Sequence, residues 1–273
     1  MEILIPVLVL AVIALVCALI LTISSVFFAV KEDPRCAAVR DCLPGANCGA
    51  CGFSGCDGYA KALADGVTDN PSLCIPGSDR VAKEIGEIMG LEAGEVVERV
   101  AYVACNGSCL PSERKYAYDG TKTCLAANMS YSGDRDCTFA CLGYGDCVKV
   151  CPRDAICINE KKFIAEIDPR KCIGCGLCVK ECPNGIISLV NDTSRVVVKC
   201  SSHDKGAQVR KVCSNGCIAC GKCEKNCPEG AIKVENNLAT IDYSKCTGCG
   251  TCHEVCPVKC IHAGNFICGA HFE

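Results

Sequence analysis

Cysteine is the residue that most constrains what this chain can fold into, because 31 of its 273 residues are thiols. A secreted disulfide scaffold is usually much shorter than this chain, so the thiols are predicted to bind metal. Tryptophan is absent and aromatic residues make up 5% of the chain, which leaves little material for one large aromatic core. The sequence therefore predicts several small units held together by inorganic crosslinks.

An apolar segment begins the chain. Residues 3–30 contain no charged residue and are long enough to cross a hydrocarbon layer of about 30 Å. A cleaved signal peptide would have a basic start and a shorter apolar stretch, so we expect a transmembrane helix in contact with membrane lipid. Lys31 and Arg35 follow it, and basic flanks favour the cytoplasmic side, where thiols stay reduced. We expect the rest of the chain on the cytoplasmic side of a bacterial or archaeal cell membrane.

The first cysteine block lies within residues 43–77. Cys48, Cys51 and Cys56 fall within nine residues, and the glycines between them let the backbone curl around a compact inorganic core. Cys74 follows a short predicted helix. Zinc is the alternative occupant, since Cys-x2-Cys pairs are common in zinc sites. The longer gap before Cys56 and the glycines favour a 4Fe–4S cluster.

Residues 77–136 carry packing patterns rather than chemistry. Val81, Ile85, Ile88 and Met89 predict one amphipathic helix. Valines at positions 96, 97, 100 and 103 predict a second helix. We expect a first domain over residues 31–104 and a linker or irregular cap over residues 105–136.

Residues 124–256 contain a tandem repeat of a unit with two cysteine motifs. The cysteines at 124, 137, 141, 147 and 151 recur 76 positions later, at 200, 213, 217, 223 and 227. The second motif, at residues 172–182, recurs 74 positions later at residues 246–256. Both copies read C-x2-C-x2-C-x3-C-P, the bacterial ferredoxin pattern, in which the first three thiolates bind one cluster and the fourth binds its neighbour.

This repeat predicts an α+β fold with two bacterial-type ferredoxin modules, at residues 137–192 and 200–268. Short β signals at residues 155–158, 163–167, 186–190, 231–234 and 238–241 flank the cysteine blocks. We expect βαβ-like units with pseudo-twofold symmetry in each module.

One block departs from the ferredoxin pattern, because Tyr144 stands where the second ligand belongs. Either this cluster has lost an iron or another thiol replaces the ligand, and Cys137 is the nearest candidate. Cys213 holds the matching place in a module that already has four ligands, which argues for caution. Cys105, Cys109, Cys124, Cys157, Cys200 and Cys213 receive no role. A further cluster or a shielding role stays open for the pairs Cys124/Cys137 and Cys200/Cys213.

The crossing of the fourth ligand assigns four thiols to each cluster of the two modules. The first module is predicted to use Cys137, Cys141, Cys147 and Cys182 for one cluster and Cys151, Cys172, Cys175 and Cys178 for the other. The second module is predicted to use Cys217, Cys220, Cys223 and Cys256, and Cys227, Cys246, Cys249 and Cys252.

Several function classes are excluded. The chain has no G-x-G-x-x-G after a strand, no P-loop and no flavin signature, so we expect single-electron transfer and no substrate site. A net charge of −3 argues against nucleic-acid binding. Residues 120–273 are nevertheless net basic. We therefore predict that Arg210, Lys211 and Lys222 dock an acidic soluble ferredoxin, the alternative being a solvated face.

The apolar span, the 43–77 block and the tandem ferredoxin motifs, in this order, resemble the B subunit of Rnf complexes along essentially the whole chain. The resemblance implies that Cys48, Cys51, Cys56 and Cys74 bind a cluster, which makes five 4Fe–4S clusters. It also implies electron transfer from reduced soluble ferredoxin to the membrane and flavoprotein subunits of a complex that couples ferredoxin:NAD oxidoreduction to Na⁺ or H⁺ translocation. A tethered polyferredoxin of a hydrogenase or CO dehydrogenase is the alternative. A zinc scaffold without redox activity is a third interpretation.

Overall fold

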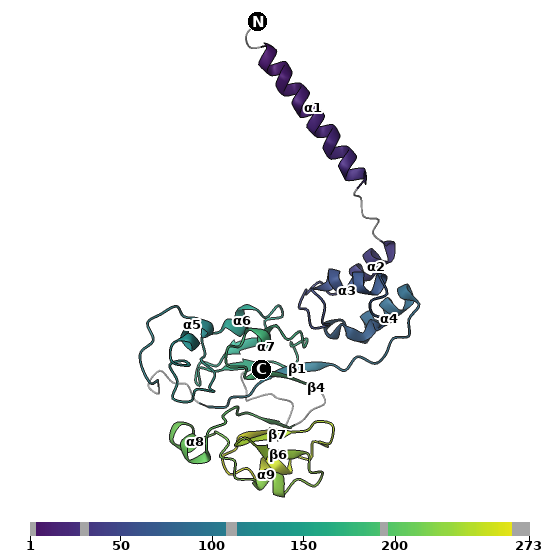
Figure 1. Cartoon of the computed structure of the whole chain (residues 1–273). Coiled ribbons are helices and arrows are strands. Elements are labelled where there is room, and N and C mark those ends of the chain that lie inside the picture. The colour runs from purple at the N-terminus through teal and green to yellow at the C-terminus, as the bar shows by residue number, and fades with distance from the viewer. Residues whose placement is uncertain (1–3, 28–32, 108–113, 192–195, 264–273) are drawn as a thin grey trace.

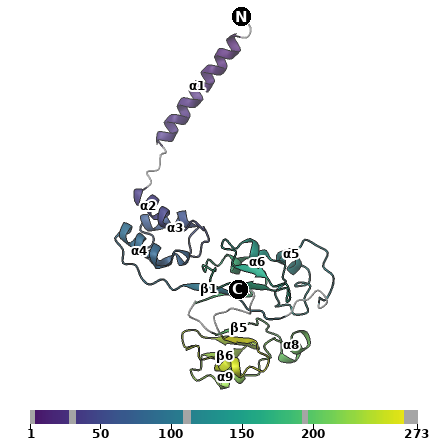
Figure 2. The same cartoon turned by 180° about the vertical axis from the view of Figure 1, so that it is seen from behind.

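The computed structural model describes residues 4–27, 33–107, 114–191 and 196–263. Four parts follow one another in space in the order of the sequence: a long helix, a small helical domain and two modules that contain strands (Figure 1). The second module lies farthest from the long helix, and the view from behind shows the same order (Figure 2).

The long helix α1 spans Leu4–Phe27 and extends away from the rest of the chain (Figure 1). Its segment Val7–Ser24 has a mean hydropathy of 3.1, and none of that segment is buried against other parts of the protein. By length and composition α1 can cross a membrane.

The helical domain contains α2 (Pro34–Cys42), α3 (Cys56–Ala64), the short 3-10 helices η1 (Pro71–Leu73) and η2 (Ile75–Gly77), and α4 (Ser78–Met89). The predicted helix over Val81–Met89 is thus confirmed, and it ends at Gly90 in a left-handed conformation. Its buried face packs Val81 and Ile85 against Tyr59 and Leu63. This core fixes the loop that carries Cys48 and Cys51.

The second predicted helix, on the valines at 96–103, is wrong. Residues Arg99–Val103 form strand β1, which pairs antiparallel with β4 (Ile187–Asn191) so that Val103 stands opposite Ile187. Valine favours strands, and here the available partner strand decides the conformation. β1 lies within residues 31–104 but is part of the sheet of the first module.

The two modules share one topology. In the first, β2 (Ile156–Ile158) and β3 (Ala165–Ile167) form a hairpin inside the β1–β4 pair. In the second, β6 (Ile232–Glu235) and β7 (Leu238–Ile241) form the hairpin inside the pair of β5 (Val196–Val198) and β8 (Ile261–Ala263). All four pairs are antiparallel, so the modules consist of antiparallel pairs and contain no parallel βαβ crossover in their described parts. The five predicted strands are confirmed, whereas β1, β5 and β8 were not predicted.

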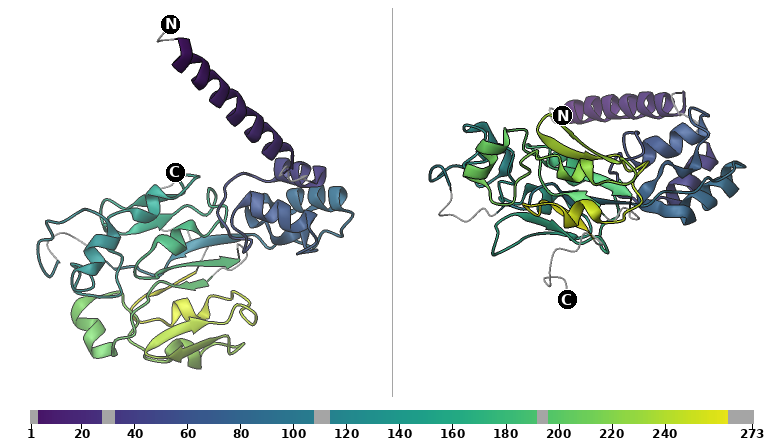
Figure 3. Two further views of the ribbon diagram at one scale, coloured as in Figure 1. Left: turned by 45° about the horizontal axis from the view of Figure 1, so that its top comes forward. Right: turned by 90° about the horizontal axis from the view of Figure 1, so that it is seen from below.

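Short helices connect the strands and carry many of the cysteines. The first module has α5 (Cys124–Met129), α6 (Asp146–Lys149) and α7 (Leu177–Glu181), and the second has α8 (Gly206–Val212), α9 (Lys222–Lys225) and α10 (Thr251–Glu254). The left view of Figure 3 shows the two modules next to each other. Val100 of β1, Val190 of β4 and Val197 of β5 form a small apolar cluster between them.

Candidate iron–sulfur cluster sites

Three cavities of nearly equal size are each lined by four thiols. Each holds 350 to 360 Å³ of empty space, counted with its open mouth. Two of them bring together sets that were predicted from the sequence: Cys151, Cys172, Cys175 and Cys178 in the first module, and Cys227, Cys246, Cys249 and Cys252 in the second. In both, the thiol before proline joins three thiols of the other motif, as the ferredoxin crossing requires.

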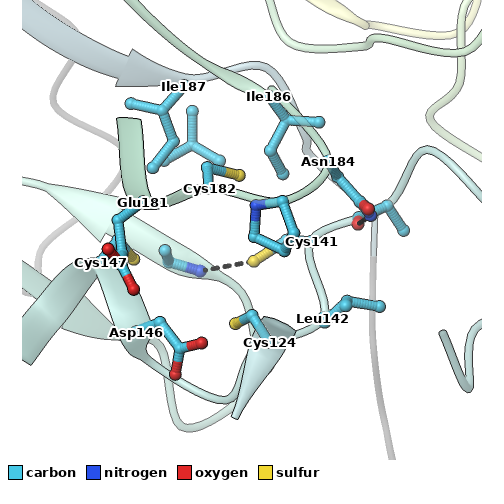
Figure 4. A pocket seen from close by; sticks show the side chains of 14 residues that line it. Cys124, Cys141, Leu142, Asp146, Cys147, Glu181, Cys182, Asn184, Ile186 and Ile187 are labelled. Atoms are coloured by element: carbon cyan, nitrogen blue, oxygen red, sulfur yellow. Dashed lines mark hydrogen bonds between the residues drawn. The ribbon is translucent and has the colours of Figure 1, made fainter. Parts of the chain in front are cut away.

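The third cavity contains a thiol that we did not predict. Cys124 lines it together with Cys141, Cys147 and Cys182, and Figure 4 shows these four side chains around one space. Cys124 is the first residue of α5. The Thr123 side chain accepts a hydrogen bond from the N–H of Ala126, which caps this helix.

A contact with α6 fixes α5 in place. The backbone N–H of Leu125 donates to Asp146 Oδ2 at 3.1 Å. Asp146 is buried and directly precedes the ligand candidate Cys147. Cys124 and Cys147 are therefore held on facing helix starts.

The loop between Cys141 and Cys147 keeps a ferredoxin conformation although it lacks the second thiol. Gly143 and Gly145 have φ of +77° and +81°, and the corresponding Gly174 and Gly176 of the complete motif have +65° and +72°. A side chain at Gly143 would come within 2.2 Å of the carbonyl oxygen of Phe163, so this loop requires glycine there.

Tyr144 itself makes hydrogen bonds with the 114–135 segment. Its hydroxyl donates to Asp134 Oδ2 at 2.7 Å and accepts from Arg114 Nη1 at 2.7 Å. Asp134 is fully buried, and its Oδ2 is also 2.5 Å from Arg114 Nη1. The hydrogen bond to Asp134 and burial raise the pKa of Tyr144 to about 12, burial being the larger cause. Tyr144 therefore stabilises the segment that leads to α5.

Cys137, which the sequence analysis assigned to this cluster, does not line the cavity of Cys141. Cys137 lines a different, larger cavity with Cys105, Cys200 and Cys213. The backbone N–H of Ala140 donates to the Cys137 carbonyl in a turn between Cys137 and Cys141, and the two thiols line different cavities. The repeat contained a signal for Cys124, since Cys124 and Cys200 occupy matching positions, but no spacing rule linked it to Cys141.

The remaining set of the second module also comes together in its core. Cys217, Cys223 and Cys256 are buried in one apolar cluster, and Cys220 is exposed. Cys260 adds a fifth thiol, with its Sγ 3.6 Å from Cys256 Sγ. The Cys260 thiol also donates to Cys217, which lowers the pKa of Cys217 to about 6. By the 74-residue offset, Cys260 occupies the place that Ile186 has in the first module.

The helical domain brings the four thiols of the first block together. Cys56 begins α3, where its N–H donates to Asn47 Oδ1 at 2.9 Å, and Cys74 lies between η1 and η2. Burial, and to a smaller extent the neighbouring Cys56, Cys48 and Cys51, raise the pKa of Cys74 to about 11. This domain contacts the first module, because Lys180 Nζ donates to the carbonyl oxygen of Cys48 at 3.2 Å.

Backbone amides point at several of these sulfurs. The N–H groups of Ala155 and Ala231 donate to Cys151 Sγ and Cys227 Sγ, both at 3.3 Å, at equivalent positions of the two modules. Cys141 Sγ and Cys172 Sγ accept from Ala165 and Ala101 at 3.4 Å. Such bonds stabilise negative charge on sulfur and tune the reduction potential of a cluster.

The three thiol-lined cavities suit a core of several atoms better than a single zinc ion. Among the described residues, no three His, Cys, Asp or Glu side chains are arranged to hold a single ion. The thiols line cavities instead, which leaves room for a core of several atoms between them.

The predicted docking residues lie on the second module. Arg210 and Lys211 belong to α8, and Lys222 begins α9. Arg210, Lys211 and Lys222 are all exposed. They are therefore accessible to a partner protein.

Three family models match segments of the chain that contain some of these thiols. A family model for an Fe-S cluster matches residues 43–76, one for a 4Fe-4S binding domain matches residues 165–188, and one for a 4Fe-4S dicluster domain matches residues 210–263. None of these three matches includes Cys105, Cys124, Cys137 or Cys200.

Relatives match most of the chain. It is 45% identical over 95% of its length to the B subunit of the Na(+)-translocating ferredoxin:NAD(+) oxidoreductase complex of Acetobacterium woodii, covering 77% of that protein. It is 43% identical over 86% of its length to the B subunit of the proton-translocating ferredoxin:NAD(+) oxidoreductase complex of Clostridium ljungdahlii, covering 83% of that protein. The B subunit of an ion-translocating oxidoreductase complex of Methanosarcina acetivorans is 41% identical over 72% of the chain, which covers 74% of that protein. The chain therefore belongs to the family of B subunits of ion-translocating ferredoxin:NAD(+) oxidoreductase complexes, the Rnf complexes.

Proposed function

We propose that this chain is the iron–sulfur relay of an Rnf complex, which takes electrons from reduced soluble ferredoxin and passes them to the other subunits. At least five 4Fe–4S clusters carry the electrons one at a time. Four occupy the two modules, and Cys124 supplies the thiolate that the ferredoxin pattern would have at position 144. The fifth is bound by Cys48, Cys51, Cys56 and Cys74 in the helical domain.

The adjacency of the four-thiol sets carries this proposal. In each module the two sets share one short cysteine run, so their clusters lie close together. The first module continues into the helical domain, because Lys180 of α7 binds the Cys48 carbonyl and the Cys48 thiol raises the pKa of Cys175, although burial is the larger cause. Electrons can thus leave the first module through the cluster of Cys175 and reach that of Cys48 without a domain movement.

Electrons enter at the second module. Cys220 and Cys249 are exposed, so two of its clusters come close to the surface. Lys222 of α9 lies two residues from Cys220 in the sequence, and α8 adds Arg210 and Lys211 to the same module; these charges complement an acidic ferredoxin. The helical domain, nearest to α1, is then the exit toward the membrane subunits (Figure 1).

Helix α1 anchors the chain. Its exposed apolar surface suits lipid or the helices of partner subunits, and the basic flank of Lys31 and Arg35 favours the cytoplasmic side for the cluster domains. The Na⁺- and H⁺-translocating relatives support the Rnf role over a polyferredoxin of a hydrogenase or CO dehydrogenase.

Ferredoxin docking is tested by charge reversal in the purified complex. We expect the triple variant Arg210→Glu, Lys211→Glu and Lys222→Glu to slow reduction by ferredoxin in stopped-flow measurements, about tenfold at low salt, and to flatten the dependence on salt. Reduction by a small neutral donor and the iron content should not change. The control variant Lys61→Glu, Lys83→Glu and Lys161→Glu alters the net charge equally on sites elsewhere. An unchanged ferredoxin rate in the α8 and α9 variant would rule out docking at this surface.

A further inference from the structure

Four thiols without a role in the five clusters meet between the two modules. Cys105, Cys137, Cys200 and Cys213 line one cavity, which holds about 1200 Å³ when counted with its open mouth. Two of the thiols come from the first module and its preceding segment, and two come from the second. None follows a ferredoxin motif, so only the fold brings them together.

Short contacts place these thiols around one space. A methyl group built at Gly107 would lie 3.5 Å from Cys213 Sγ and 3.9 Å from Cys105 Sγ, so both sulfurs are neighbours of the same glycine. Burial, and to a smaller extent the Cys105, Cys200 and Cys213 thiols, raise the pKa of Cys137 to about 12. Two buried basic side chains, Arg135 and Lys199, also line the cavity and offset negative charge.

The interface around this cavity is held by specific hydrogen bonds. Asn106 Oδ1 accepts from Lys162 Nζ of the first module at 3.2 Å, and Asn106 Nδ2 lies 3.0 Å from His262 Nε2 of the second. The Asn106 carbonyl accepts from Asn215 Nδ2 at 3.0 Å, and Ser201 Oγ donates to the Phe139 carbonyl at 3.1 Å. The four thiols are therefore held in a defined arrangement.

Two hydrogen bonds connect this cavity to the cluster sites on either side. The Cys105 thiol accepts from the backbone N–H of Cys141, a ligand in the first module. Cys200 Sγ accepts at 3.3 Å from the backbone N–H of Cys217, the equivalent ligand in the second. A cluster bound here would be in direct hydrogen-bond contact with one neighbouring cluster site in each module.

We propose that Cys105, Cys137, Cys200 and Cys213 bind a sixth 4Fe–4S cluster that carries electrons between the two modules. Binding deprotonates the four thiols, because thiolates are the ligands of such clusters. In each transfer the cluster of Cys217 loses one electron, the sixth cluster gains it and then reduces the cluster of Cys141. No bond is formed or broken and no other reactant is needed.

The test counts clusters in the full-length protein, isolated without oxygen. Native mass spectrometry resolves chains by their number of clusters, so incomplete loading leaves the highest occupied state readable, and iron and sulfide analysis gives the average. We expect six clusters, or about 24 Fe, in the wild type and five in Cys200→Ala and in Cys213→Ala. These two positions are preferred to Cys105, because Cys109 lies nearby in the sequence. Cys157→Ala removes an exposed thiol of β2 and should retain six.

Three results would overturn the proposal. The wild type would reach only five clusters, or Cys200→Ala and Cys213→Ala would keep the wild-type number, or the cavity would bind one zinc ion per chain. The wild-type count decides alone if the variants do not fold. The cluster count is independent of the ferredoxin assay. A count of five clusters would therefore leave the Rnf role intact, and a failure of ferredoxin docking would leave the sixth cluster site intact.

Discussion

Exchange of Cys124 and Tyr144 tests how the first module completes its incomplete motif. Cys124→Ala removes one of the four thiols around the cavity of Cys141, so we expect the loss of one cluster, about four Fe and four sulfide per chain. Tyr144 occupies the backbone position of the missing ligand, between two glycines with ferredoxin conformations. The second change Tyr144→Cys should therefore restore the cluster in the Cys124→Ala background.

The rescue has a cost that the structure allows us to estimate. Tyr144→Cys removes the hydroxyl that binds Asp134 and Arg114, and a lost hydrogen bond to a charged group costs about 1–3 kcal/mol. Asp134 keeps its ion pair with Arg114, so the buried carboxylate retains a partner. We therefore expect a lower thermal midpoint in the double variant but a full cluster count.

The matched control is Cys137→Ala with and without Tyr144→Cys. Its lost cluster belongs to the cavity between the modules, so Tyr144→Cys should not restore it. Iron and sulfide analysis and electron paramagnetic resonance of the reduced protein measure all four variants. Rescue of Cys137→Ala together with no loss in Cys124→Ala would refute the placement of Cys124 and return Cys137 to the cluster of Cys141.

Two further predictions concern the second module. Cys260→Ile introduces the residue that the first module has at this place and removes the thiol that donates to Cys217. The reduction potential of the Cys217 cluster should therefore become more negative in a redox titration, while the cluster count stays the same. An unchanged potential would contradict a tuning role of Cys260. The pKa of His262 is lowered from 6.5 to about 4. Burial is the largest cause, and nearby Lys199 also lowers it. The unfolded chain therefore binds more protons between these values, and the stability that the neutral imidazole contributes is lost as the pH falls from about 6.5 toward 4. The thermal midpoint of His262→Gln should fall less than that of the wild type between pH 6.5 and 5, and equal slopes would show that another group titrates.

Local spacing predicted those parts of the sites that lie within one motif. The sets of Cys175 and Cys249 come together as the ferredoxin run indicates, because the run encodes both the loop and the crossing. Cys124 could not be found in this way, since it reaches its cavity through the docking of α5 on α6, 17 residues before Cys141 in the sequence. Proximity in sequence instead pointed to Cys137, which lines the cavity between the modules.

The strands show the same limit. The hairpins β2–β3 and β6–β7 connect neighbours in the sequence, and their alternation was visible. β1, by contrast, has valines whose spacing fits a helix, and it becomes a strand because β4, 84 or more residues later, supplies the hydrogen bonds. The cavity of Cys105 likewise depends on contacts between modules that no local pattern contains.

The enclosing strand pairs also determine the order in which the protein can be completed during synthesis. A chain leaves the ribosome with its N-terminus first, and β1 and β5 each wait for the last strand of their own module. Within a module the final thiols of the two sets stand four residues apart, Cys178 and Cys182 in the first and Cys252 and Cys256 in the second. Each module therefore gains its full set of ligands almost at once, just before its last strand emerges. The two ligand sets of a module are thus completed together, and the four thiols of the helical domain emerge well before either pair of sets.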